Sequence, residues 1–240
     1  MVRTKTGKRG LRRYLRGGWR EETLPVNVFL VEHRAGFLLF DAGQTALATE
    51  PGYFPWWYPF FRLARFELGP EDEAAAQMRR LGLSPPDLRW IVLSHLHTDH
   101  AGGLHRLLGP PVVVSAVEWA RATGFEGGLR GYLPRYWPAS LEPRLVEFAD
   151  GPVGPFPASS RLSEDGALVL VPTPGHTSGH MSLLAVEDEA RVLFIGDMAE
   201  TADGLDRAAP AVAAFCRTEQ VTVLAAHASL APELARRLAR

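Results

Sequence analysis

Short apolar runs separated by turn residues dominate the first half of the chain. The runs "VNVFLVEH" and "GFLLFDAG" are separated by "RAG", which predicts a β-hairpin. The later runs "RWIVLS" and "PVVVSA" predict two buried strands. Between the hairpin and these strands, "EDEAAAQMRRLG" predicts a helix with acidic residues in its first turn, ending at Gly82. We also expect "GLHRLL" and "VEWARA" to be helical.

The second half predicts a second set of strands. Residues 123–165 are rich in glycine, proline and aromatic residues, which is typical of long loops. The stretch 167–201 then predicts three strands with polar residues at the joints, and "VTVLAAH" predicts a last strand. Ser229 is expected to cap a final helix through "APELARRLAR". Strands in both halves with helices between them predict an α/β fold of two packed sheets flanked by helices, in one domain spanning 1–240.

Composition and charge are those of a globular protein of ordinary type. The 240 residues are 46% hydrophobic and 22% charged, and the net charge of -1 gives no general electrostatic case for nucleic acid. No apolar run reaches the ~18 residues of a membrane span, and no secretory signal is evident. The single cysteine, Cys216, is predicted to be a buried structural thiol. A cytoplasmic location is therefore the default expectation.

Two segments have unusual composition. Residues 1–24 form a basic arm with eight positive side chains before Glu21, which suits a solvated arm or edge hairpin, or else an anion-binding patch. Residues 51–69 form an aromatic-rich insertion, and positions 53–66 alone hold eight of the 23 aromatic residues. These aromatic side chains could line a ligand pocket or a lid, form a homodimer contact, or fill the core of a loop.

The strongest chemical signal is "VLSHLHTDHAGG". It places His95, His97, Asp99 and His100 within six positions, although histidine supplies only 8 of 240 residues. Residues two apart in an extended segment project the same way, so His95 and His97 can bind one cation. A tight turn into the following helix would bring Asp99 and His100 to a second position. Imidazole together with carboxylate favours zinc or a similar ion over calcium.

Three more potential ligands follow predicted strands in the second half of the chain. His176 lies in a turn after a strand, Asp197 ends "RVLFIGD", and His227 ends "TVLAAH". We expect His180 to orient the turn that carries His176, without being a ligand itself. His33 is expected in the hairpin turn and His105 on a helix surface.

These motifs together resemble those of the metallo-β-lactamase superfamily. The resemblance rests on "HLHTDH", "GH" at 175–176, "GD" at 196–197, the late histidine, and an early "FDAG" whose Asp41 matches the family's structural aspartate. It implies a four-layer αβ/βα sandwich with two divalent metal ions at one edge. Zinc is the expected metal, although iron, manganese or cobalt accept the same ligands. By position, the first metal would be held by His95, His97 and His176, the second by Asp99, His100 and His227, and both by Asp197.

Within that superfamily, "LPVNVFLVEHRAGFLLFDAG" and "MRRLGLSPPDLRWIVLSHLHTDHAGG" resemble the N-acyl homoserine lactonase branch. The resemblance implies a hydrolase that opens an ester or lactone carbonyl with a hydroxide bridging two metal ions. Asp99 would be the catalytic residue, orienting the nucleophile and passing a proton to the leaving oxygen. The expected partner is a small acyl substrate, without membrane or nucleic acid. Candidate substrate-binding residues are Tyr53, Phe54, Trp56, Trp57, Phe60, Phe61, Tyr132, Tyr136 and Glu200.

One position departs from the lactonase pattern and leaves alternatives open. That branch has a tyrosine three residues after the bridging aspartate, whereas this chain has Glu200, and an ionised carboxylate cannot donate a hydrogen bond. Tyr132 or Tyr136 is the expected substitute. The alternative functions are a glyoxalase-like thioesterase, although the C-terminal helical region of that branch is missing, and a metal-dependent ribonuclease or phosphodiesterase, which the basic arm supports. A binding module without catalysis is opposed by the complete set of seven ligands.

Overall fold

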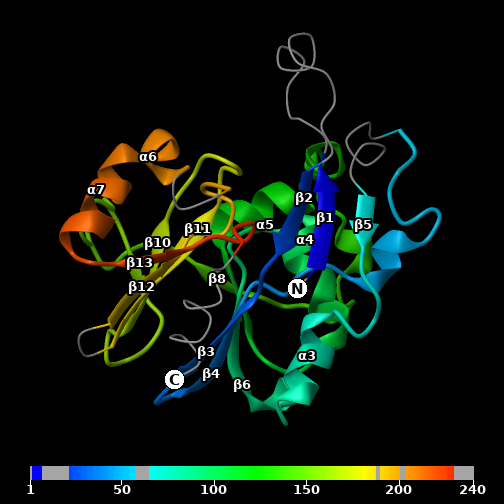
Figure 1. Ribbon diagram of the computed structural model, residues 1–240, viewed down its shortest axis with the longest axis horizontal. Helices are drawn as coiled ribbons and strands as arrows, with labels where there is room; N and C mark the ends of the chain where they lie inside the picture. The colour runs from blue at the N-terminus through cyan, green and yellow to red at the C-terminus, as the bar shows by residue number, and fades with distance from the viewer. Residues whose placement is uncertain (1, 7–21, 58–64, 188–189, 201–203, 230–240) are drawn as a thin grey trace.

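Two five-stranded β-sheets form the centre of the molecule. The computed structural model describes residues 2–6, 22–57, 65–187, 190–200 and 204–229. The first sheet has the order β3-β4-β6-β7-β8 and the second β13-β12-β11-β10-β9 (Figure 1). The strands of the first sheet are β3 (Phe29–His33), β4 (Gly36–Phe40), β6 (Leu88–Val92), β7 (Val112–Ser115) and β8 (Arg144–Val146). Those of the second are β9 (Ser160–Arg161), β10 (Leu168–Pro172), β11 (Met181–Glu187), β12 (Ala190–Phe194) and β13 (Thr222–Leu224).

Helices cover the outer face of each sheet. Against the first sheet lie α3 (Ala74–Arg80), α4 (Thr98–Ala101), η3 (Gly102–Arg106) and α5 (Ala116–Thr123). Against the second lie α6 (Leu205–Ala208) and α7 (Pro210–Thr218), where Cys216 is buried as predicted. The remaining short 3-10 helices are η1 (Ala46–Thr49), η2 (Pro85–Asp87), η4 (Gly127–Arg130) and η5 (Pro134–Tyr136). The expected four-layer αβ/βα arrangement of two mixed sheets is therefore confirmed.

The central strands read as continuous apolar runs because both of their faces are covered. In β4, Leu38 and Phe40 point into the core between the two sheets, while Leu39 points toward the helices. From the second sheet, Leu170 and Leu183 enter the same central core. All five side chains are at most 1% exposed. A strand buried on both faces loses the alternation of apolar and polar residues that a half-exposed strand shows.

The predicted helix in the first half begins later than expected. It starts at Ala74, and Glu73 precedes it with an extended backbone (φ -63°, ψ 146°), so no acidic residue lies in its first turn. The Glu73 carboxylate accepts hydrogen bonds from the Ala46 N–H at 2.8 Å and the Thr45 hydroxyl at 3.1 Å. These contacts keep Glu73 out of the helix. The helix ends before Gly82, which has a φ of +77° and terminates it as predicted.

The region predicted to be long loops also contains two short strands. Strand β8 pairs parallel with β7 and extends the first sheet, and β9 pairs antiparallel with β10 at the edge of the second. These strands have three and two residues, so neither is long enough to show a periodic pattern. The strands β10 to β13 occur where the sequence predicts them.

A third, smaller sheet joins the amino-terminal part of the chain to the aromatic-rich insertion. Strand β1 (Val2–Thr6) pairs antiparallel with both β2 (Glu22–Val26) and β5 (Arg65–Glu67). Most of the basic arm, and Phe60 and Phe61 of the insertion, lie outside the described residues. The same applies to the helix expected after Ser229.

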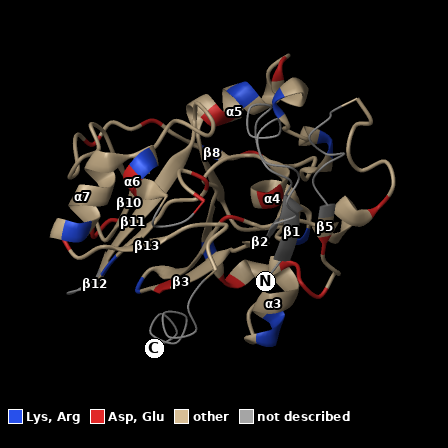
Figure 2. Cartoon of the chain, turned by 45° about the horizontal axis from the view of Figure 1, so that its top comes forward, with Lys and Arg blue, Asp and Glu red and all other residues tan. Residues whose placement is uncertain are grey.

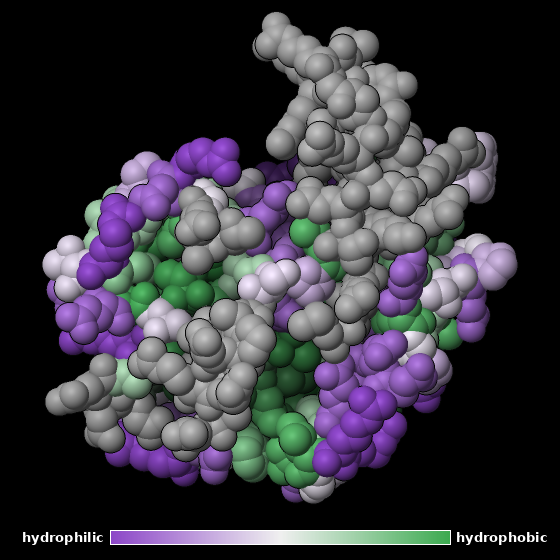
Figure 3. Space-filling view, in the orientation of Figure 1, coloured by the Kyte–Doolittle hydropathy of each residue, from purple (hydrophilic) through white to green (hydrophobic). Residues whose placement is uncertain are grey.

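Among the described residues, basic and acidic side chains occur on the same helices. Figure 2 shows basic and acidic positions on α5 and α6, with basic residues also on α3 and α7. In Figure 3 hydrophobic residues reach the surface near the end of α3, where Leu81 is 69% exposed. Among the described residues, no helix is long and apolar enough to cross a membrane.

Candidate metal centre

Seven side chains converge where strands of the two large sheets end. His95 and His97 follow β6, and Asp99 and His100 lie in α4 directly after them. The loop between β10 and β11 supplies the fifth side chain, and the loops after β12 and β13 supply the last two. These three are His176, Asp197 and His227. All seven positions that the sequence singled out are thus brought together.

Three imidazoles form the first ligand group. The Nε2 atom of His95 lies 3.1 Å from Nδ1 of His97, and this Nδ1 lies 3.0 Å from Nε2 of His176. Oxygen Oδ2 of Asp197 is 3.3 Å from the same His176 nitrogen. Ligand atoms that lie 2.0–2.1 Å from a tetrahedral zinc ion are roughly 3.3 Å apart. The spacing of this group therefore fits one ion.

Two imidazoles and a carboxylate form the second ligand group. Nε2 of His227 lies 3.6 Å from Oδ2 of Asp99, and Nε2 of His100 lies 3.9 Å from the same oxygen. Oxygen Oδ1 of Asp197 is 3.0 Å from the His227 nitrogen and 3.3 Å from the His100 nitrogen. Asp197 thus directs one carboxylate oxygen toward each group.

Backbone carbonyls hold one histidine of each group. Nε2 of His97 donates to the carbonyl of Arg130 at 3.0 Å, which leaves Nδ1 free to face the first group. Nδ1 of His227 donates to the carbonyl of Pro25 at 2.8 Å, which leaves Nε2 for the second group. A hydrogen bond at the outer ring nitrogen fixes the tautomer of a metal-binding histidine and the orientation of its ring.

Asp41 and Ser94 hold two more histidines. Asp41 accepts from Nδ1 of His100 at 2.8 Å and from the Ser94 hydroxyl at 2.9 Å. Since Ser94 donates to Asp41, its oxygen accepts from Nδ1 of His95 at 3.1 Å. Asp41 has a φ of +62°, which is unfavourable for a residue with a side chain. This unfavourable backbone conformation places the Asp41 carboxylate where it holds His100 directly and His95 through Ser94.

Two buried polar atoms of the centre have no hydrogen-bond partner. They are Nε2 of His100 and Oδ1 of Asp197, and both face the second group. Their contacts with neighbouring groups are close but lack hydrogen-bond geometry. A buried polar atom without a partner costs free energy, and a cation placed between these atoms would satisfy both. The donor set of imidazole and carboxylate suits a divalent transition-metal ion.

The electrostatics favour neutral imidazoles in the first group and an ionised carboxylate between the groups. Burial and the neighbouring imidazoles hold the pKa of His95 well below its ordinary value, and burial lowers the pKa of His97. Burial alone would raise the pKa of Asp197, but His227 and His100 hold it well below its usual range. Burial also opposes protonation of His227, but Asp197 outweighs it and raises that pKa to about 9. Neutral imidazole is the form that binds a metal.

The other histidines lie outside the ligand groups. His180 contacts both the turn that carries His176 and the residue Asp197: its Nε2 accepts from the Asp197 N–H at 3.2 Å. Its Nδ1 bonds the Thr173 hydroxyl at 2.8 Å, and burial lowers its pKa to about 3. His33 ends β3 and accepts from the Ala35 N–H in the hairpin turn. His105 lies on η3, half-buried, with Nδ1 donating to the Gly102 carbonyl.

The aromatic insertion contacts the centre through Tyr53. This side chain is buried, and its hydroxyl lies 2.9 Å from the Thr98 hydroxyl, between His97 and Asp99 in the chain. Because Thr98 donates to Gln44, Tyr53 donates to Thr98, and burial raises the pKa of Tyr53 to about 12. Of the other predicted substrate-binding residues in this segment, Phe54 packs against Phe66, whereas Trp56 and Trp57 are exposed.

The hydroxyls of the two tyrosines expected to replace the missing lactonase tyrosine lie close to other polar groups of the protein. Tyr136 stacks on Tyr53, with ring centroids 4.0 Å apart, and its hydroxyl donates to the Tyr53 carbonyl at 2.8 Å. Tyr132 packs 5.1 Å from the ring of His97, and burial and the neighbouring Glu118 carboxylate raise the pKa of its hydroxyl. Glu200 is exposed three residues after Asp197.

Besides Ser94, sequence reasoning missed Glu118 and Asn27, which support the centre. Glu118 is a fully buried carboxylate that accepts from the Leu96 N–H, between His95 and His97. Asn27 binds the carbonyls of Ala225 and Ala228, on either side of His227. A glutamate in the first turn of a helix after a serine is typical of a capping box, so the sequence alone does not distinguish Glu118 from an ordinary helix start.

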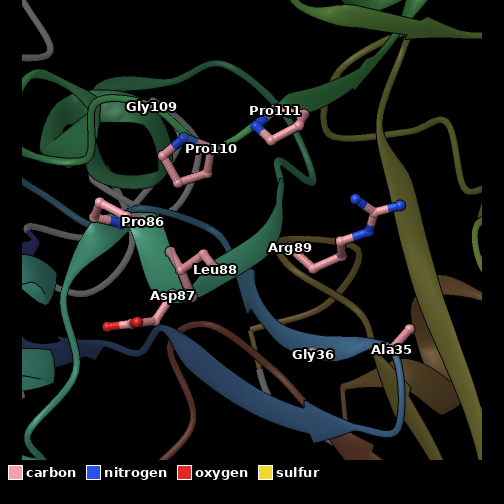
Figure 4. Close-up of a pocket in the computed structure, with 9 residues that line it drawn as sticks. All are labelled: Ala35, Gly36, Pro86, Asp87, Leu88, Arg89, Gly109, Pro110 and Pro111. Atoms are coloured by element: carbon pink, nitrogen blue, oxygen red, sulfur yellow. The ribbon is translucent and has the colours of Figure 1, made fainter.

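A separate pocket of about 440 Å³ opens at the opposite ends of the strands of the first sheet. Figure 4 shows it between the β3–β4 turn, the start of β6 and the segment before β7. These are the ends of β4, β6 and β7 remote from the histidines. The pocket therefore does not belong to the metal centre.

Comparisons with known proteins identify the family. A model of the metallo-beta-lactamase superfamily matches residues 22–220. The chain is 31% identical over 189 residues to an N-acyl homoserine lactonase of a Bacillus species, covering 78% of this chain and 69% of that protein. It is also 31% identical over 199 residues to the N-acyl homoserine lactonase AttM of Azorhizobium caulinodans, covering 78% and 70%.

Solved structures support the same fold. A mutant of Bacillus thuringiensis AiiA with N-decanoyl-L-homoserine bound at its active site matches with a TM-score of 0.75 and 22% identity, covering 94% of this chain and 89% of that one. AidC, described as a dizinc quorum-quenching lactonase, matches with a TM-score of 0.57 and 14% identity, covering 86% and 74%. The chain belongs to the metallo-β-lactamase superfamily and is a relative of its N-acyl homoserine lactonases.

Proposed function

We propose that this protein is a metal-dependent hydrolase that opens the lactone ring of N-acyl homoserine lactones. The observation that carries the proposal is the placement of Asp197, whose two oxygens face two separate ligand groups. Relatives with 31% identity are N-acyl homoserine lactonases, which supports the choice of substrate. A structural relative is a dizinc lactonase, which supports zinc as the metal.

Two divalent ions would occupy the two ligand groups. His95, His97 and His176 would hold the first, Asp99, His100 and His227 the second, and Asp197 both. When bound, such a pair lowers the pKa of water toward neutrality and polarises a carbonyl oxygen. The chain supplies imidazoles and two carboxylates in a largely buried setting, so the charge of the ions would be only partly neutralised.

Asp99 is the proposed catalytic residue. Its side chain is 20% exposed, more than those of His100 and Asp197, so it is the carboxylate of the centre most accessible to a substrate. A carboxylate at this position can orient the attacking water by accepting its proton, and can then transfer that proton to the leaving oxygen of the opened ring. The hydrogen bond from Tyr53 to Thr98 fixes the backbone on the amino-terminal side of Asp99.

Aromatic residues beside the centre are the proposed contact for the acyl chain. Tyr53 and Tyr136 stack next to α4, and the exposed Trp56 and Trp57 follow Tyr53 directly. An apolar wall close to the reacting carbonyl would stabilise long acyl chains more than short ones, by about 0.8 kcal/mol for each buried methylene group.

Ring opening releases a proton, so a pH-indicator assay tests the proposal. We expect turnover of N-acyl homoserine lactones that increases with chain length, with little turnover of glutathione thioesters or RNA. Preferred cleavage of a thioester or RNA would favour the thioesterase or nuclease alternative. Elemental analysis should find close to two metal equivalents per chain, and a chain that binds none after purification in zinc would contradict the proposal.

Replacing one ligand provides the matched test. His97→Ala should reduce turnover by at least a hundredfold and remove one metal equivalent, because Nδ1 lies at the centre of the first group. His105→Ala is the control, since this histidine lies on η3 outside both groups. Full activity of His97→Ala would refute the assignment.

A further inference from the structure

We infer that Glu118 is a positioning residue for the first metal, and this inference rests on the proposed function. Glu118 lies in the first turn of α5 with a side chain that is 0% exposed. It contacts none of the reacting groups directly. Its carboxylate instead joins the three chain segments that carry or orient the ligands of the first group.

The first connection is to the segment that carries two ligands. Oε1 of Glu118 accepts from the N–H of Leu96 at 3.0 Å. Leu96 lies between His95 and His97, after β6 has ended at Val92, so its N–H is not part of the strand ladder. The hydrogen bond therefore fixes the extended backbone that turns His95 and His97 toward the same point.

The second connection is to the turn that carries the third ligand. Oε2 of Glu118 accepts from the Thr177 hydroxyl at 2.8 Å, directly after His176. The same turn packs against the start of α5 at Gly179, where an added Cβ atom would lie 2.1 Å from the Glu118 nitrogen. A hydrogen bond and close backbone packing thus both fix this turn against Glu118.

The third connection is to the loop that orients His97. Burial and the neighbouring Glu118 carboxylate raise the pKa of the Tyr132 hydroxyl, and the Tyr132 ring packs against His97. Tyr132 also forms a β-bridge with His97, two residues after the Arg130 carbonyl that accepts from His97 Nε2. Glu118 therefore limits the movement of the group that selects the metal-binding nitrogen of His97.

The charge of Glu118 also bears on the metal. Its two hydrogen-bond donors, the Leu96 N–H and the Thr177 hydroxyl, are neutral, so they offset the cost of burying a carboxylate only in part. The amino-terminal end of α5 contributes a favourable dipole. A divalent cation in the first ligand group would supply the remaining compensation, so removing the charge should weaken metal binding as well as loosen the ligands.

Glu118→Gln tests this inference, because it keeps the shape and removes the charge. Glutamine keeps one carbonyl oxygen, and its amide nitrogen cannot accept, so the hydrogen bond from either Leu96 or Thr177 is lost. Glu73→Gln is a matched control: Glu73 is 3% exposed, precedes a helix, and accepts from a threonine hydroxyl and a backbone N–H. Both variants lose a buried carboxylate, but only the Glu118 carboxylate is connected to the first ligand group.

The readouts are zinc affinity by chelator competition and the absorption spectrum of the cobalt(II)-loaded protein. We expect Glu118→Gln to bind one of two equivalents about ten- to a hundredfold more weakly, with an altered cobalt spectrum, while Glu73→Gln matches the wild type. Equal affinities in both variants would overturn the inference. If Glu118→Gln fails to fold, Thr177→Val removes one donor and should weaken the same equivalent, and unchanged binding would again overturn it. Failure of the wild type to bind metal would instead refute the proposed function.

Discussion

The carboxylate of Asp197 can face two ligand groups because the residue before it has no side chain. Gly196 has a φ of +48°, and an added Cβ atom would lie 2.6 Å from the Ser94 side chain. The chain therefore turns sharply at the end of β12 and passes close to the His95 segment. The Asp197 N–H is held by His180, so the carboxylate extends from a backbone that is fixed on both sides.

Glu200 is where the chemistry of this chain departs from the lactonase pattern. Glu200→Tyr would restore a phenolic donor, and a single hydrogen bond to a developing oxyanion contributes a factor of about 10²–10³. We expect kcat for N-acyl homoserine lactones to increase at least tenfold in a steady-state assay. Glu200→Gln is the control, since it removes the charge without adding a phenol. An increase shared by both variants would assign the effect to charge.

Individual ligands could be predicted because histidine and aspartate at strand ends have few structural explanations. His176, Asp197 and His227 each follow an apolar run, and the polar character of each stands out against that run. Glu118 and Asn27 could not be predicted, since a glutamate in a first helical turn and an asparagine in a connection are common without any role at a site. Their function depends on partners about 20 and 200 positions away.

At the scale of elements, the connection between β2 and β3 holds the loop after β13. Asn27 bonds the carbonyl of Ala228 at 2.7 Å and that of Ala225 at 3.3 Å, and its own N–H donates to the Ala226 carbonyl at 2.8 Å. The Pro25 carbonyl accepts from His227 itself. Three hydrogen bonds from Asn27 and one to Pro25 in β2 therefore hold the loop and the imidazole of His227.

Asn27→Ala should weaken the second metal position selectively. The variant loses both side-chain hydrogen bonds, so we expect about tenfold weaker binding of one metal equivalent and a stability loss of about 1–3 kcal/mol. Chelator competition and denaturant unfolding measure the two effects. Ser159→Ala is the control, because Ser159 is also buried and its hydroxyl donates to the Gly151 carbonyl away from the centre. If both variants bind metal equally, Asn27 has no part in holding His227.

The elements themselves were predictable wherever they are long and covered on both sides. Strands β4, β6 and β10 are continuous apolar runs bounded by turn residues, and each occurs where expected. Strands β8 and β9 were not predictable, because two or three residues carry no pattern and their pairing is decided by neighbours elsewhere in the chain. The start of α3 was predicted too early, because the Glu73 side chain bonds to the segment of Thr45 instead of entering the helix.

For the whole molecule, the metal centre connects the two sheets. His95 and His97 follow a strand of the first sheet, whereas His176, Asp197 and His227 follow strands of the second. An ion held by both sets would oppose separation of the sheets along the core formed by Phe40 and Leu183. Metal binding should therefore contribute to global stability.

Removal of metal tests this contribution. A ligand present at about a thousand times its dissociation constant stabilises the folded state by about 4 kcal/mol, which corresponds to roughly 10 °C in Tm for a chain of this size. We expect treatment with a chelator to lower Tm by an amount of that order, and zinc to restore it, in differential scanning calorimetry. An unchanged Tm after verified metal removal would mean that the ions do not hold the sheets together.

The contact between Pro25 and His227 has a consequence for synthesis of the protein. Pro25 is synthesised early and His227 late. A nascent chain therefore contains every ligand of the first group before the second group is complete. During translation the protein would first become competent to retain one ion and only afterwards two. Proteolytic trimming that reached residue 227 would return a finished molecule to that earlier state.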